Sequence, residues 1–218
     1  MTQPRIALIH ALAHSPAPIN AALARDWPQA QRMNLLDDSL SADLARTGSL
    51  DDRMTQRFLA LADYAVDSGA DAILFTCSAF GPCIEAVKRR HGGRPVLKPN
   101  EAMVDEAVAR AGSRPIGLVA SFGPTLQSMP PEFPREAVVR TGLTEGALAA
   151  LDAGDTATHD RLAAEAAVVL AAQGCAVIAL AQFSLARARD TVAEATGLPV
   201  LTTPDSAVAR LKRLLGAV

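Results

Sequence analysis

The sequence predicts an α/β protein with two similar lobes, each a mainly parallel four-stranded sheet flanked by helices. Short aliphatic runs alternate with longer segments of helical periodicity, which is the pattern of parallel strands covered on both faces. The chain also repeats itself, because GADAILFTC from Gly69 matches GCAVIALAQ from Gly174 at an offset of 105 residues. Two further blocks recur in the same order, the first starting at Arg5 and Pro115 and the second at Pro95 and Pro199. We therefore expect two copies of one unit.

Eight apolar runs are the expected strands. They are Arg5–His10, Arg32–Leu36, Ala72–Thr76, Pro95–Leu97, Pro115–Ala120, Ala137–Thr141, Ala176–Ala181 and Pro199–Leu201. A division after the fourth strand separates residues 1–98, which carry Cys77, from residues 99–218, which carry Gln182. A final helix at about 205–215 could pack on either lobe.

Two helices between these strands are marked by apolar residues at helical spacing. The positions are Met54, Phe58, Leu61 and Ala65 in the first helix, and Leu162, Ala166 and Val169 in the second. Acidic or hydroxyl residues precede each pattern and are expected to cap the helix or occupy its first turn: Asp51 and Asp52, then Asp155 and Thr156.

Composition excludes several classes of function. The chain has 218 residues and a formal net charge of −2, which provides no electrostatic footprint for nucleic acid or an anionic membrane. Its apolar runs are too short to span a bilayer, and no basic leader opens the sequence. Three cysteines without framework spacing predict reduced thiols and a cytoplasmic location. No histidine cluster, G-x-G-x-x-G turn or P-loop indicates a metal or nucleotide site.

Ligands of open parallel sheets bind beyond the carboxyl ends of the strands, and Cys77 and Gln182 lie at two of these ends. The segments that this rule selects are His10–Ser15, Cys77–Gly81, Lys98–Asn100, Ser121–Thr125, Gln182–Ser184 and Thr202–Pro204. Equivalent strand ends of two such units tend to face each other across a cleft. Cys77 follows its strand and precedes a helix, so we expect the helix dipole and backbone N–H groups to favour the thiolate. Such a cysteine can act as a base or a nucleophile. The alternative is a small core residue, because free cysteine is among the most buried residue types.

Four segments together resemble the aspartate/glutamate/hydantoin racemase superfamily. They are FTCSAFG from Phe75, GLVASFG from Gly117, IALAQFSLAR from Ile178 and LPVLTTPDSAV from Leu198. The resemblance implies two pseudo-twofold-related lobes with the active site between them, and no pyridoxal phosphate, metal or other cofactor. In the racemases of this superfamily, one cysteine from each lobe flanks the α-carbon of the substrate. Maleate isomerases use one cysteine as a nucleophile, and arylmalonate decarboxylases keep only one of the two.

By this resemblance, Cys77 matches the first-lobe cysteine and Gln182 occupies the place of the second. A carboxamide forms hydrogen bonds but has no accessible pKa for acid–base work. The resemblance further implies that the loops beyond the strands donate hydrogen bonds to a carboxylate; their expected substrate-binding residues are Ser78, Ala79, Ser121, Phe183 and Ser184. His14, or else His10, is the candidate for a second acid–base group. Cys83 and Cys175 are expected in the core.

The resulting hypothesis is a racemase or isomerase acting at the α-carbon of a small carboxylic acid, with Cys77 as acid/base or nucleophile. The alternatives are a one-cysteine decarboxylase and an inactive relative that binds a small acid. Phe80, Phe122 and Phe183 near the loops suggest a partly apolar substrate, ordinary loop packing being the alternative. The sequence is compatible with a homo-oligomer but does not decide the oligomeric state.

Overall fold

The computed structural model describes residues 3–13 and 15–217, and the chain divides into two compact units. The first unit consists of the chain up to Pro99 together with the chain from Ala207 onward, and the second unit is Asn100–Ser206. Within the described residues, no helix has both the length and the apolar character needed to cross a membrane.

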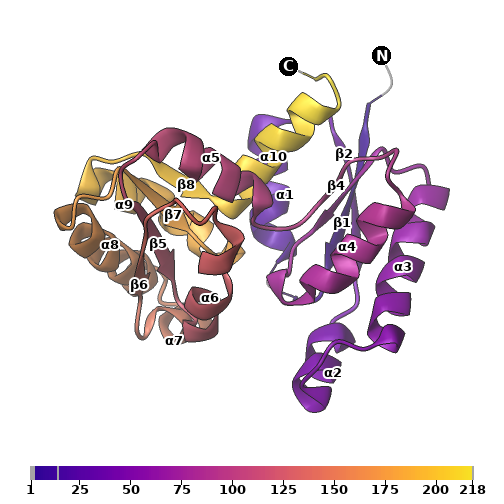
Figure 1. Cartoon of the computed structure of the whole chain (residues 1–218), viewed down its shortest axis with the longest axis horizontal. Helices are drawn as coiled ribbons and strands as arrows, with labels where there is room; N and C mark the ends of the chain where they lie inside the picture. The colour runs from indigo at the N-terminus through magenta and orange to yellow at the C-terminus, as the bar shows by residue number, and fades with distance from the viewer. Residues whose placement is uncertain (1–2, 14, 218) are drawn as a thin grey trace. The chain divides into compact units, whose positions relative to one another are not determined.

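The first unit is a parallel sheet in the order β2-β1-β3-β4. Its strands are β1 (Arg5–His10), β2 (Gln31–Leu36), β3 (Ala72–Phe75) and β4 (Val96–Leu97). Its helices are α1 (Pro16–Asp26), α2 (Ser39–Thr47), α3 (Asp52–Asp67) and α4 (Gly81–Arg90). Figure 1 shows α3 and α4 along one face of this sheet and α1 along the other.

The second unit repeats this arrangement, with the order β6-β5-β7-β8 and every pair parallel. Its strands are β5 (Ile116–Ala120), β6 (Val139–Leu143), β7 (Val177–Leu180) and β8 (Val200–Thr202). Its helices are α5 (Glu101–Ala111), α6 (Gly123–Ser128), α7 (Ala147–Asp152), α8 (Thr156–Ala172) and α9 (Arg189–Thr196). Residues of α5 share one core cluster with the sheet, and those of α8 and α9 share another, so helices cover both faces.

The last helix, α10 (Thr203–Leu214), begins in the second unit and continues into the first. In the first unit, Lys212 Nζ donates a hydrogen bond to the carbonyl oxygen of Asp26 at the end of α1, over 3.1 Å.

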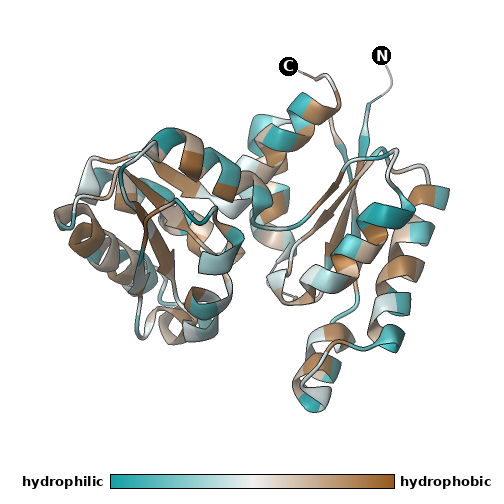
Figure 2. Cartoon of the chain, viewed as in Figure 1, coloured by the Kyte–Doolittle hydropathy of each residue, from teal (hydrophilic) through white to brown (hydrophobic). Residues whose placement is uncertain are grey.

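The predicted fold class is confirmed, since the chain forms two parallel four-stranded sheets flanked by helices. All eight predicted strands are present, with boundaries that differ by at most two residues. The inner strands β1, β3, β5 and β7 are almost wholly buried, which explains why they read as continuous apolar runs. Figure 2 shows these strands in brown at the centre of each unit.

The predicted helix starts are confirmed, and the apolar spacing noted in the second helix does not coincide with its buried face. Asp51 caps α3 by accepting from the Met54 N–H at 2.7 Å, and Asp155 caps α8 by accepting from the Thr158 N–H at 3.0 Å. In α8, however, Val169 is 57% exposed. The buried stripe consists of His159, Ala163, Ala164, Ala167 and Leu170. This alanine-rich helix is apolar on several sides, so several stripes satisfy the helical period equally well.

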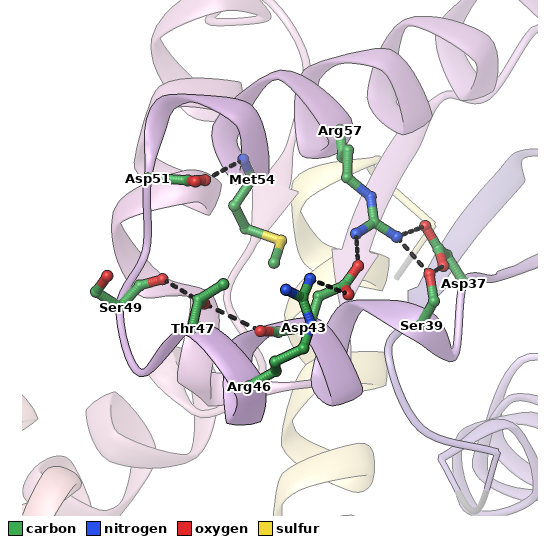
Figure 3. Close-up of polar contacts among 9 residues, drawn as sticks. All are labelled: Asp37, Ser39, Asp43, Arg46, Thr47, Ser49, Asp51, Met54 and Arg57. Atoms are coloured by element: carbon green, nitrogen blue, oxygen red, sulfur yellow. Dashed lines mark hydrogen bonds and ion pairs between the residues drawn. The ribbon is translucent and has the colours of Figure 1, made fainter.

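An arginine joins α2 to α3 in the first unit. Arg57 on α3 contacts Asp43 through Nη1 and Asp37 through Nη2, each at 2.6 Å (Figure 3). Burial opposes ionisation of Asp37, but hydrogen bonds from Ser39 and Arg57 outweigh it and lower the pKa of this carboxyl. Asp43 accepts from Arg46 and Arg57, which lowers its pKa as well. The two carboxylates therefore fix the position of α2 beside α3.

Candidate active site

Cys77 and Gln182 occupy equivalent backbone positions in the two units. The preceding residues, Thr76 and Ala181, donate their backbone N–H groups to the neighbouring strand at 3.1 and 2.9 Å. Cys77 then has φ −128° and ψ 120°, and Gln182 has φ −136° and ψ 147°. Both residues are extended, and each immediately precedes a 3-10 helix, η1 (Ser78–Phe80) or η3 (Phe183–Ala188). The repeat in the sequence thus corresponds to a repeated strand end in each sheet.

Cys77 is a partly buried thiol, not an activated thiolate. Its side chain packs against the core of the first unit, and burial raises the pKa of the thiol although the backbone N–H of Ala79 acts in the opposite direction. The expected effect of the backbone N–H groups is present in the contact with Ala79, but burial outweighs it, so the net shift of the thiol pKa is opposite to the expectation. The helical segment after Cys77 begins as a 3-10 turn and continues as α4, but burial of the thiol opposes its ionisation more strongly, so desolvation of the thiolate prevails. At neutral pH, Cys77 carries a proton that it can donate.

The surroundings of Cys77 account for this desolvation. A small pocket beside the thiol is lined mainly by apolar residues: Ile9, Ala11, Leu40, Phe58 and Phe75, together with His10. Phe80, at the end of η1, packs on Phe58 with ring centroids 4.8 Å apart. The aromatic core thereby anchors the turn that carries Cys77.

His10 contributes to this structure as a neutral, hydrogen-bonded group. Its side chain is fully buried, with Nδ1 2.9 Å from Thr76 Oγ1 and Nε2 3.0 Å from Asn34 Oδ1. Asn34 Oδ1 also accepts from Asn20, so the Nε2 atom of His10 bears the hydrogen. Burial lowers the pKa of His10 despite the bond to Asn34. Both ring nitrogens are engaged in hydrogen bonds within the first unit. His14, the other candidate, lies outside the described residues.

Gln182 is held by the loop that follows β5. Its Oε1 atom accepts hydrogen bonds from both the backbone N–H of Ser121, at 2.6 Å, and the Ser121 hydroxyl, at 3.0 Å. A backbone N–H can only donate, so the atom that faces it must be the amide oxygen. The NH2 group of Gln182 is directed away from Ser121, and no acceptor for it is found among the described residues.

The other residues expected at the site differ in accessibility. Ser78 and Ala79 are exposed, and Ser184 is partly exposed. Phe183 is buried, as is Phe80, whereas Phe122 is 52% exposed. Of the three phenylalanines, only Phe122 is largely accessible to solvent.

The two remaining cysteines are buried, and Lys98 forms an ion pair. Cys83 is buried in α4, and Cys175 is buried before the start of β7, at the amino edge of the sheet. Lys98 forms an ion pair of 2.8 Å with Glu85. The described residues contain no group of three or more His, Cys, Asp or Glu side chains that could hold a metal ion.

Asn100 lies in one of the strand-end segments selected from the sequence, but no role was predicted for it. Its side chain is only 3% exposed, and its Nδ2 atom has no hydrogen-bond partner among the described residues. An asparagine just before a helix usually signals a cap. Here the side chain makes no cap bond to α5. The sequence pattern therefore gives no sign that the Asn100 amide is buried and unpaired.

Comparison with known proteins agrees with the fold. The family model for Asp/Glu/hydantoin racemases matches residues 17–211. An allantoin racemase from Klebsiella pneumoniae superposes with a TM-score of 0.74 at 17% identity, covering 98% of this chain and 88% of that one. A glutamate racemase from Bacillus anthracis gives 0.72 at 12% identity, covering 100% and 83%. An arylmalonate decarboxylase gives 0.70 at 20% identity, covering 98% and 93%. No curated protein sequence matches the chain. The family model spans most of the sequence, and the protein belongs to the Asp/Glu/hydantoin racemase family.

Proposed function

We propose that this protein is a cofactor-independent enzyme that acts at the α-carbon of a small carboxylic acid, with Cys77 as the residue that moves the proton. The observation that carries this proposal is the placement of Cys77 at the carboxyl end of β3, partly accessible, while Cys83 and Cys175 are buried. Family membership supports a racemase or isomerase class of reaction. Gln182 is proposed as the partner group contributed by the second unit.

In a racemase or isomerase reaction, the Cys77 thiolate removes the α-proton, and the electron pair of the C–H bond moves onto the substrate carboxylate. The resulting enediolate is stabilised by hydrogen-bond donors near its oxygens. A proton must then return to the opposite face of the α-carbon. Gln182 cannot supply it, because a carboxamide has no accessible pKa. Under this reaction, water or another group delivers the second proton.

The raised pKa of Cys77 favours a second candidate, decarboxylation followed by protonation from one face. The bond between the α-carbon and one carboxylate of a malonate breaks, CO2 leaves, and the electron pair moves into the remaining carboxylate. The Cys77 S–H group then donates its proton to the α-carbon and becomes a thiolate, which regains a proton from water. This reaction requires a protonated thiol at rest and needs no second acid. The residues therefore support one-sided proton delivery better than the family label alone suggests.

The test is to incubate the protein in D2O with malonates, amino acids and unsaturated diacids. NMR detects deuterium at the α-carbon, and released CO2 is measured in parallel. A racemase places solvent deuterium in both enantiomers, whereas the decarboxylase gives one α-deuterated enantiomer and CO2. Cys77→Ala should abolish either activity, and the matched control Cys175→Ser should retain it. Activity that survives in Cys77→Ala would refute the role of Cys77. If the wild-type protein binds small acids but turns over none of the panel, the inactive-relative hypothesis is favoured instead.

A further inference from the structure

We infer that Ser121 locks the Gln182 side chain in one orientation, so that its NH2 group is a fixed donor to an anionic oxygen of the substrate. This inference rests on the proposed function, since it assumes that the substrate reaches the strand end that carries Gln182. It assigns Ser121 a positioning role and Gln182 a role in choosing the substrate.

The lock follows from the chemistry of the two hydrogen bonds. Oε1 of Gln182 accepts from two donors on one residue, the Ser121 N–H at 2.6 Å and the Ser121 hydroxyl at 3.0 Å. Reversing the amide would place an NH2 group against a backbone N–H, which has no lone pair to accept. Ser121 immediately follows β5 and Gln182 lies two residues beyond β7, and these two strands pair in parallel. The sheet therefore holds donor and acceptor at the same edge.

The locked orientation selects the kind of group that Gln182 can bind. Its oxygen already accepts two hydrogen bonds, which is the usual capacity of an amide oxygen, so it has little left to offer a substrate ammonium. Its NH2 group carries two donors that lack an acceptor among the described residues. Donors of this kind bind carboxylates, and the bond strengthens as charge accumulates on oxygen. A second carboxylate, as in a malonate, fits this requirement better than the amino group of an amino acid.

The test uses malonate as the probe, with malonamide as its neutral counterpart, and measures affinity by calorimetry. Gln182→Glu keeps the size of the side chain and replaces the NH2 donors with a charged oxygen. Near neutral pH we expect malonate affinity weaker than in the wild type by about tenfold or more, because two like charges then face each other, with malonamide much less affected. The ratio of the two proteins' malonate affinities should approach one as pH falls and the introduced carboxylate takes up a proton. Taking the ratio at each pH cancels the titration of malonate itself.

The Ser121 variants test the positioning role. Ser121→Ala removes one of the two bonds and should weaken malonate binding roughly three- to tenfold, the range for one net hydrogen bond. Ser121→Thr keeps the hydroxyl and should bind within about twofold of the wild type. Circular dichroism checks that each variant is folded. The inference is wrong if Gln182→Glu binds malonate as tightly as the wild type does, or if its malonate affinity is reduced by the same factor at every pH. Equal losses in Ser121→Ala and Ser121→Thr would overturn the lock.

Cys77→Ala separates this inference from the proposed function. It should abolish turnover and leave malonate binding intact. If Cys77→Ala retains turnover while Gln182→Glu shows the pH-dependent loss of malonate affinity, the proposed function is wrong and the inference stands. If Cys77→Ala loses turnover while Gln182→Glu shows no pH-dependent loss of malonate affinity, only the inference is wrong.

Discussion

Gly117 lies in β5 beneath α8, and replacing it with alanine should destabilise the second unit. A Cβ atom at this position would lie 2.8 Å from Ile178 Cδ1 and 3.2 Å from both Cβ and Cδ1 of Leu170. The Ile178 methyl is the end of a flexible side chain and can rotate. Leu170 Cβ is fixed to the helix backbone and cannot, so α8 must shift slightly from the sheet.

Overpacking of this kind costs about 1–3 kcal/mol. Alanine also restricts the unfolded chain more than glycine does, which returns about 0.4–1 kcal/mol. We therefore expect Gly117→Ala to lower the free energy of unfolding of the second unit by about 1–2 kcal/mol. Gly93→Ala is the matched control, because no atom lies within 4 Å of its added Cβ. That variant should be neutral or slightly stabilised.

The assay is amide hydrogen exchange of α8 peptides followed by mass spectrometry, which reports opening of the second unit separately from the first. Ile178→Val removes the closest methyl, so Gly117→Ala should cost less in that background than in the wild type. Amide exchange of α8 as slow in Gly117→Ala as in Gly93→Ala would show that the sheet accommodates the added methyl group without strain. An equal loss of stability in Gly117→Ala with isoleucine or valine at position 178 would show that the Ile178 methyl does not contribute to the clash.

Three further predictions concern titrating groups. The alkylation rate of Cys77, followed by mass spectrometry against pH, should have its midpoint above the ordinary thiol value of about 8.5, and a midpoint at or below that value contradicts its burial. Arg57→Ala should lower stability to urea at neutral pH. Because the pKa of Asp37 is lowered in the folded protein, this difference should shrink as pH falls below about 3.9, and a difference unchanged at about pH 3 would argue against the ion pair. His10 has a lowered pKa when folded, so the unfolded chain binds more protons below about pH 6.5 and stability should decrease there. His10→Gln should flatten that decrease in urea unfolding, and an unchanged slope would show that His10 is not its source.

Local patterns of the sequence were enough to predict the strands and the helix starts. Fully buried parallel strands read as uninterrupted apolar runs, and Asp51 and Asp155 precede their helices in the way that capping residues do. The buried face of α8 could not be predicted, because alanines on several sides of this helix satisfy the same period. A helix face is decided by the sheet on which it packs.

The candidate site likewise has features that the sequence predicted and features that depend on packing. The repeat identified Cys77 and Gln182 as equivalent strand ends, and the structure places both in the same extended conformation before a 3-10 turn. The state of the thiol could not be predicted in the same way. Its pKa depends on apolar side chains distant in the sequence, including Leu40 and Phe58, whose burial of the thiol outweighs the hydrogen bond from the Ala79 backbone. The unpaired amide of Asn100 could not be predicted either, because its position before α5 suggests a cap that its side chain does not form.

Local runs of residues that recur in order along the chain were sufficient to predict the fold class, the internal repeat and the family. What the two groups at the strand ends can do depends instead on how the chain packs in three dimensions. Burial sets the protonation of Cys77, and Ser121, far from Gln182 in the sequence, sets the direction of its amide. Desolvation and hydrogen-bond direction depend on neighbours in space, which the order of residues along the chain does not specify.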